Sequence, residues 1–223
     1  MVVFIIILVL IAALYIYLKF YRDPEWVRKA YEGKTAEQKE VIRYFLIGGC
    51  LRKKWTDAEY DAYVAKSILD LKQRGMDKIG LDEDQLKEIE PVHFEGYRFD
   101  SDAYSKKGED NIWRSSKYEV SWLFFSDTQV YLYQKSISFD KDSIKERTEE
   151  YFYKDITNFS TVSESKKVSI KDKDGNAQKF DIGTTEFKIV VPGDSFLCAM
   201  GQNDYTERAI QGMKAKLREK KQA

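Results

Sequence analysis

The side chains best suited to catalysis in this sequence are few and lie far apart. His93 is the only histidine, and no cysteine or serine motif adjoins it. A catalytic histidine needs a nucleophile and an orienting group within reach, so a lone histidine predicts a structural or surface role. Cys50 and Cys198 predict small buried side chains in a reducing compartment. No phosphate-binding loop, dinucleotide fingerprint, zinc-protease or C-x-x-C motif occurs. The sequence therefore predicts a protein that is not an enzyme.

Two acidic patterns share only their first positions with calcium-binding loops. Asp172-x-Asp174-Gly175 lacks the later ligands and the closing glutamate, and Asp100-x-Asp102 fails in the same way. Both patterns are typical of turns. We therefore expect neither a metal nor a cofactor.

Basic side chains near the start of the β-rich region are the candidate binding residues for a lipid headgroup or a partner. They are Lys106, Lys107, Arg114 and Lys117. A second basic hairpin follows, with Lys166, Lys167, Lys171, Lys173 and Lys179. Acidic residues intervene in both, which favours a solvated strand edge over lipid binding. Residues 23–223 carry 35 basic and 37 acidic side chains, so we expect no nucleic-acid partner.

The elements that position these side chains begin with an uncharged segment. Residues 1–18 contain no charged side chain, and a helix of that length spans about 27 Å, close to the roughly 30 Å hydrocarbon core of a bilayer. A cleaved signal peptide would need a basic start and a small-residue cleavage site. A helix buried in a soluble core would show a polar face. Neither pattern is present, so we predict an uncleaved, single-pass transmembrane anchor over residues 1–21.

The charges beside this segment predict its orientation. Residues 19–54 contain ten basic and five acidic side chains. Because cytoplasmic flanks carry the excess of Lys and Arg, we place the N-terminus outside the cell membrane and the remaining domain in the cytoplasm. The same basic side chains suit either anionic headgroups or a solvated helix surface.

Residues 22–93 form the predicted helical segment. Thr35-Ala36-Glu37-Gln38 and Thr56-Asp57-Ala58-Glu59 are capping-box patterns, each followed by apolar residues at helical spacing. The first helix is predicted to end at Gly48-Gly49 and the second at Gly75. A short third helix is predicted from near Asp82 to the residue before Pro91.

Residues 94–223 form the predicted β-domain. Apolar and polar residues alternate over 118–125, and Ser126-Asp127-Thr128 predicts a turn into a second strand. Further short strands are predicted at 150–153, 159–162, 168–170, 180–182, 187–191 and 196–200. Turn signals at 174–176 and 192–194 predict antiparallel hairpins. A C-terminal helix with Ile210, Met213 and Leu217 on one face should cover the sheet, with Trp122 and Phe124 as core neighbours.

The order of about seven short strands and one final helix resembles bacterial pleckstrin-homology-like and GRAM-like domains over residues 95–221. The segments LFFSDTQVY (123–131) and YFYKDITNF (151–159) carry this resemblance. It implies an α+β fold whose antiparallel β-barrel or sandwich is bent, partly open and capped by the C-terminal helix. Members of these families mostly recruit lipids or proteins.

These features predict a non-enzymatic, membrane-tethered binding module that presents its cytoplasmic domain to a protein partner or to anionic lipid. The alternative is an accessory subunit of a membrane-bound complex that docks through its helical segment. Crosslinks concentrated on the β-domain would favour the first function, and crosslinks concentrated on residues 35–90 would favour the second.

Overall fold

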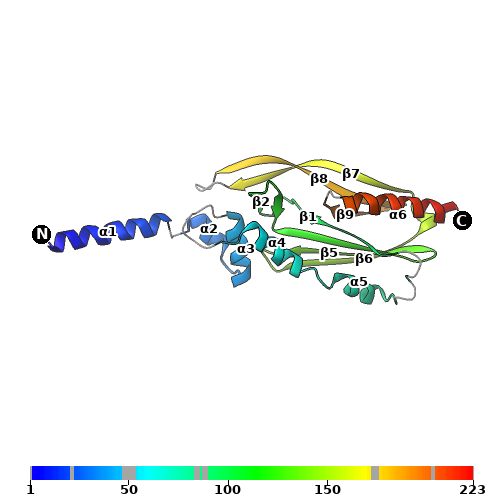
Figure 1. Ribbon diagram of the computed structural model, residues 1–223, viewed down its shortest axis with the longest axis horizontal. Helices are drawn as coiled ribbons and strands as arrows, with labels where there is room; N and C mark the ends of the chain where they lie inside the picture. The colour runs from blue at the N-terminus through cyan, green and yellow to red at the C-terminus, as the bar shows by residue number, and fades with distance from the viewer. Residues whose placement is uncertain are drawn as a thin grey trace.

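The computed structural model describes residues 2–20, 23–46, 54–82, 86, 90–171, 176–201 and 204–222. It confirms the predicted α+β class with antiparallel sheets. Figure 1 shows the layers: the β7–β8 ribbon lies on one side, a four-stranded sheet lies in the middle, and α5 covers the far side of that sheet.

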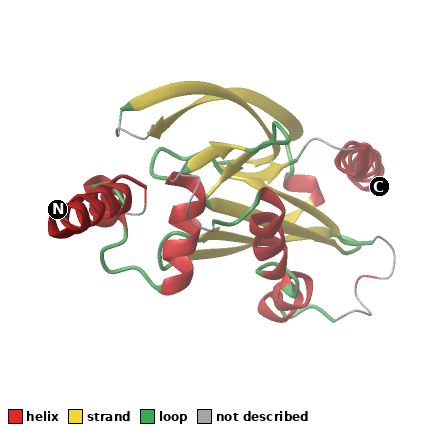
Figure 2. Ribbon diagram, turned by 60° about the vertical axis from the view of Figure 1, so that its left-hand side comes forward, coloured by secondary structure: helices red, strands yellow, loops and turns green. Residues whose placement is uncertain are grey.

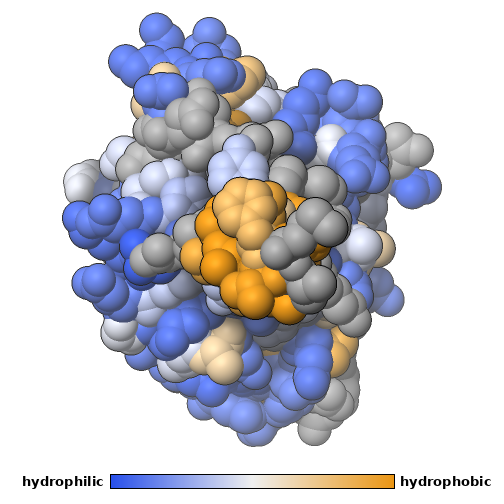
Figure 3. All heavy atoms as spheres, turned by 90° about the vertical axis from the view of Figure 1, so that its left-hand side faces the viewer, coloured by the Kyte–Doolittle hydropathy of each residue, from blue (hydrophilic) through white to orange (hydrophobic). Residues whose placement is uncertain are grey.

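The apolar N-terminal segment forms α1, Val2–Phe20, and projects from the body of the molecule (Figure 1). Every side chain from Val3 to Tyr17 is exposed. Viewed from this end, α1 is a compact apolar patch on a mostly hydrophilic face (Figure 3). Among the residues that the structure describes, no helix has both the length and the apolar character needed to cross a membrane.

Four short helices follow: α2 (Glu25–Ala30), α3 (Ala36–Leu46), α4 (Asp57–Lys66) and α5 (Leu71–Ile79). Both predicted capping boxes are confirmed. The Thr56 hydroxyl accepts a hydrogen bond from the Glu59 amide, and the Glu59 carboxylate accepts one from the Thr56 amide at 2.8 Å. Thr35 and Gln38 exchange the same pair of bonds before α3.

The predicted end of the second helix is wrong. The chain turns after α4, and a separate helix, α5, begins at Leu71. Helix α5 continues through Gly75 and ends at Ile79, where Gly80 adopts a left-handed conformation (φ 76°). Gly75 lies inside the helix because α5 packs closely on the sheet: a Cβ atom at this position would lie 2.9 Å from the Tyr133 ring. Most of the third helix predicted from Asp82 lies outside the described residues, although Leu86 is buried.

The middle layer is an antiparallel sheet in the order β1-β4-β5-β6. Its strands are β1 (Val92–Tyr97), β4 (Lys117–Phe125), β5 (Gln129–Ser138) and β6 (Ser143–Phe152). The predicted turn at 126–128 joins β4 to β5. His93 therefore belongs to β1 and not to the helical segment predicted over residues 22–93.

A second sheet in the order β7-β8-β9 faces the first. β7 (Asn158–Lys171) and β8 (Ala177–Val191) are long strands that each join two of the predicted short ones, and β9 (Asp194–Met200) follows a turn at Gly193 (φ 85°). The predicted turn at Asp174-Gly175 lies outside the described residues. A hairpin of β2 (Ser105–Lys107) and β3 (Trp113–Ser115) and a 3₁₀ turn, η2 (Tyr153–Asp155), complete the β-region.

The sheets do not close into the predicted barrel, because the described strands fall into three separate sheets. β6 ends in η2 instead of pairing with β7. On the other side, β9 approaches β1 and the Gly201 amide donates to the Glu95 carbonyl at 2.9 Å. Gly96 permits this approach, since a Cβ atom there would lie 3.3 Å from the Met200 backbone. The result is two sheets in contact along one edge (Figure 2).

The C-terminal helix α6, Asp204–Gln222, fills the space between the two sheets at one end. Ile210, Met213 and Leu217 are buried in this core, as predicted. Trp122 and Phe124 are not their neighbours, because alternate residues of β4 face opposite sides of the sheet. Leu123 and Phe125 face α6, whereas Phe124 is buried with α5 residues on the other face and Trp122 packs against that cluster.

Candidate functional site

The structure places Arg114 inside the body instead of on a binding surface. Only 3% of its side chain is exposed. The guanidinium donates two hydrogen bonds to Asp61 of α4 (2.8 and 2.6 Å) and two to Asp110 of the β2–β3 loop (2.9 and 2.7 Å). These bonds raise the pKa of Arg114 and hold the pKa of Asp110 well below its usual range. Arg114 thus fastens the hairpin to α4.

Lys106 and Lys117 are also occupied by carboxylates of the same chain. Lys106 lies 3.3 Å from Asp57 and 4.1 Å from the centre of the Tyr44 ring. Lys117 contacts Asp100 at 3.2 Å and Asp102 at 2.5 Å. Lys107 is exposed, and no carboxylate within the described ranges forms an ion pair with it. Three of the four candidate residues therefore already have internal partners.

The second basic hairpin is partly neutralised as well. Lys166 lies 3.0 Å from Glu164 and 3.3 Å from Glu186. Lys167 and Lys179 are exposed, and Lys173 lies outside the described residues.

The side chains considered for catalysis face neither each other nor a shared hollow. His93 stacks on Trp122 with ring centroids 4.7 Å apart, and its Nδ1 lies 3.3 Å from the Tyr205 hydroxyl. Cys198 is fully buried in β9, and burial raises the pKa of its thiol. Cys50 lies outside the described residues. Within the part of the chain that is described, no three His, Cys, Asp or Glu side chains form a metal-binding group.

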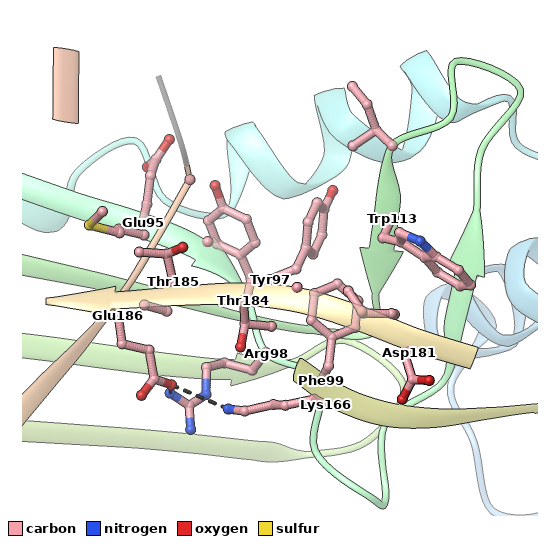
Figure 4. Close-up of a pocket in the computed structure, with 18 residues that line it drawn as sticks. Glu95, Tyr97, Arg98, Phe99, Trp113, Lys166, Asp181, Thr184, Thr185 and Glu186 are labelled. Carbon is pink, nitrogen blue, oxygen red and sulfur yellow. Dashed lines mark hydrogen bonds and ion pairs between the residues drawn. The ribbon is translucent and has the colours of Figure 1, made fainter. Parts of the chain in front are cut away.

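A hollow of about 480 Å³ opens between the end of β1 and the middle of β8 (Figure 4). It lies where β9 ends, because none of the described strands continues β9 beyond Met200 between the two sheets. The β2–β3 hairpin forms its outer end. Its lining residues come from four places in the sequence: Glu95–Phe99, Ile112–Trp113 with Tyr118, Lys166 with Asp181–Glu186, and Ala199–Gly201.

Ion pairs form one wall of this hollow. Arg98 lies 2.8 Å from Glu186 and 3.7 Å from Glu119, and Lys166 contacts the same oxygen of Glu186 as Arg98 does (Figure 4). Glu119 also accepts hydrogen bonds from the Ala199 amide at 3.0 Å and the Ser136 hydroxyl at 2.9 Å. Both glutamates are largely buried, so these contacts fix the wall and link the two sheets.

Aromatic side chains form the other walls. Burial raises the pKa of Tyr97 and Tyr118, and hydrogen bonds to Asp61 and Glu95 respectively raise them further. Both hydroxyls therefore remain hydrogen-bond donors at physiological pH. Lys106 and Lys107 line an adjoining hollow of about 510 Å³, where the Trp113 and Phe180 rings lie 5.6 Å apart.

This arrangement suits binding better than group transfer. The charged groups of the wall neutralise one another, and the hollow offers aromatic faces and an open strand edge. Sequence reasoning did not identify Arg98, Glu119 or Glu186. A detectable signal was present for Glu119, which lies between Tyr118 and Val120 in a predicted strand, because a charged residue in such a place needs a partner when it is buried.

Comparison of this chain with protein-family models, with curated proteins and with solved structures finds no match.

Proposed function

We propose that this protein is a non-enzymatic, membrane-tethered module in which α1 inserts into lipid and the α+β body binds a protein partner. The observation that carries the proposal is the exposure of α1. Its apolar side chains from Val3 to Tyr17 are roughly half to two-thirds exposed on every side of the helix. An apolar surface of this kind marks a contact with a membrane or another protein.

Of these two contacts, a lipid membrane fits the sequence around α1 better than another protein does. The residues that follow it are rich in Lys and Arg, as expected for a cytoplasmic flank. In the single-pass arrangement that these charges favour, the N-terminus lies outside the cell membrane and the body lies in the cytoplasm.

The organisation of the body favours the binding module over the accessory subunit. Helices α3 to α5 bury their apolar residues in two clusters with the outer face of the first sheet, so these faces are occupied within the chain. The hollow between the sheets is open by comparison. A four-stranded sheet, a three-stranded sheet and a final helix also accord with the resemblance to pleckstrin-homology-like domains, although the barrel is not closed.

Membrane attachment is tested by fractionating cells that produce the full chain. We expect the wild-type protein to stay in the membrane pellet after alkaline carbonate extraction and to keep residues 1–20 by intact mass. Leu10→Arg should shift it to the supernatant, because an arginine at the centre of an inserted helix costs about 2.5–3.5 kcal/mol.

Leu69→Arg is the matched control. Leu69 is 74% exposed and Leu10 is 63% exposed, but Leu69 belongs to the body. The control protein should stay in the pellet. Equal extraction of both variants, or a mature N-terminus beyond residue 20, would contradict the proposal.

A further inference from the structure

One edge of β8 is unpaired over half of the strand. β7 pairs with β8 along nearly its whole length, from Ala177 to Val190. β9 pairs with the opposite edge only from Thr185 to Val191. Among the strands that the structure describes, residues 177–184 therefore pair on one side only. An unpaired edge presents backbone N–H and C=O groups that can accept another strand.

The free edge borders a channel that β9 already occupies further along. β9 lies between β8 and β1, with its end held by the Gly201–Glu95 hydrogen bond. Beyond that point the same channel continues as the hollow between β8 and the residues Tyr97, Phe99 and Trp113 (Figure 4). The adjoining hollow shares Trp113 and Asp181 with it, continues along β8 to Gln178, and reaches over the face of the β7–β8 ribbon to Ile170.

We propose that an extended segment of the partner protein adds to β8 along residues 177–184, in line with β9. This inference rests on the proposed function and names the partner's form at the same site. Eight residues of extended chain cover about 27 Å and would satisfy the backbone groups of the edge. The channel is bounded on its second side by β1 and by the β2–β3 hairpin, so it accepts one strand and not the sheet of a second copy.

The residues that line the channel indicate which side chains the bound partner segment should carry. A strand running in the direction of β9 places alternate side chains against the aromatic pair Trp113 and Phe180, which favours apolar or β-branched residues there. Lys107 lines the same stretch without an ion-pair partner among the described residues, which favours an acidic side chain opposite it. The segment is thus a short extended peptide with alternating apolar residues and at least one acid.

The test uses the full chain in lipid nanodiscs and a phage-displayed library of random twelve-residue peptides as the probe. Selected peptides are titrated against the wild-type protein and two variants. Gly183→Trp should fill the channel without disturbing the fold, because a Cβ atom at Gly183 meets no atom within 4 Å. Gly212→Trp is the matched control, since Gly212 is equally open but lies on α6, away from the channel. Thermal unfolding verifies that both variants fold like the wild type.

We expect the peptides to bind the wild type and the Gly212→Trp protein with similar affinity and the Gly183→Trp protein at least about tenfold more weakly. Bound peptide should also slow the hydrogen exchange of amides in residues 177–184. Failure to select any peptide, or binding that Gly183→Trp leaves unchanged, would overturn strand addition. Membrane attachment and crosslinking to a partner are measured in separate experiments. The peptide-binding result therefore tests strand addition to β8 and does not decide the proposed function.

Discussion

Arg114 has a planar guanidinium that fits the two carboxylates it joins. Asp61 and Asp110 each receive two hydrogen bonds from it, so this buried side chain joins the β2–β3 hairpin to α4 beside the contacts that Lys106 and the Glu109 amide make with Asp57. We predict that Arg114→Lys lowers the free energy of unfolding by roughly 1–3 kcal/mol, because an ammonium cannot form both paired contacts. Chemical denaturation measures the loss.

The matched control for this substitution is Lys107→Arg on the same hairpin. Lys107 is exposed and forms no ion pair with the described residues, so its exchange should change the unfolding free energy by less than about 0.5 kcal/mol. Equal effects of the two substitutions would show that the Arg114 contacts contribute nothing to stability.

Glu146 on β6 makes stability depend on pH. It accepts hydrogen bonds from Arg74 at 2.6 Å, from the Tyr133 hydroxyl at 2.9 Å and from Lys78, which tie α5 to the sheet. The Arg74 contact is the main reason that its pKa falls to about 2 from a model-compound value of 4.5. Because the unfolded chain takes up this proton first, the stabilisation is complete above about pH 4.5 and is lost as the pH falls toward 2.

We predict that Glu146→Gln lowers the melting temperature near neutral pH and that its difference from wild type shrinks as the pH falls from about 5 to 2. Glu150→Gln is the control on the same strand, since Glu150 is exposed and has only a 3.4 Å contact with Gln129. A constant difference between Glu146→Gln and wild type across this pH range would contradict the assignment.

Among the elements, α5 shows how close packing can outweigh the higher helix propensity of alanine. Alanine normally stabilises a helix interior by about 1 kcal/mol relative to glycine. At Gly75, a new Cβ atom would lie 2.9–3.1 Å from three atoms of the buried Tyr133 side chain. Overpacking of this kind costs roughly 1–3 kcal/mol, so we predict that Gly75→Ala lowers the melting temperature.

Gly212 on α6 provides the comparison for Gly75. A Cβ atom there meets nothing within 4 Å, so Gly212→Ala should raise the unfolding free energy by up to about 1 kcal/mol. If both substitutions stabilise the protein, α5 does not pack on Tyr133 as closely as described.

Elements with a strong local pattern could be predicted from the sequence, and those that depend on distant contacts could not. The capping boxes at Thr35 and Thr56 and the β4–β5 turn are encoded within a few residues and are confirmed. β2 and most of β6 lack an apolar alternation, because charged and small polar residues fill them. The continuation of α5 through Gly75 depends on Tyr133, which lies far away in sequence.

The candidate site was harder to predict for the same reason. Lys and Arg side chains usually lie on the surface, so the basic residues chosen from the sequence were expected to be exposed. Arg114 is buried instead, because the fold brings carboxylates from distant parts of the chain next to it. Glu119 and Ala199, which join the two sheets beside the hollow, lie 80 residues apart. The pleckstrin-homology-like relationship, the anchor and the partner stay predictions.

At the scale of the whole molecule, the body and α1 are separable. The side chains of residues 3–17 of α1, which the structure describes, take part in none of the three apolar cores. We predict that residues 23–223 alone melt at the temperature of the full chain and do not sediment with anionic liposomes, because this part carries a net charge of only −2.

The liposome experiment has an informative opposite outcome. Sedimentation that weakens with salt and disappears when Lys106, Lys107, Arg114 and Lys117 are neutralised would make lipid headgroups the preferred ligand of the body. A fall in melting temperature on removal of α1 would show instead that α1 contacts the body.

The contact between β1 and β9, which joins the two sheets, also bears on the order in which the body folds. The β4–β5, β5–β6 and β7–β8 hairpins join strands that are neighbours in sequence, whereas the Glu119–Ala199 contact closes a separation of 80 residues. Loop closure over such a distance is slow, so the two sheets meet late. α6 completes the core between them and is synthesised after every strand, long after α1. A chain that inserts α1 during synthesis would therefore hold its unfinished sheets, with their exposed strand edges, beside the bilayer until α6 is made.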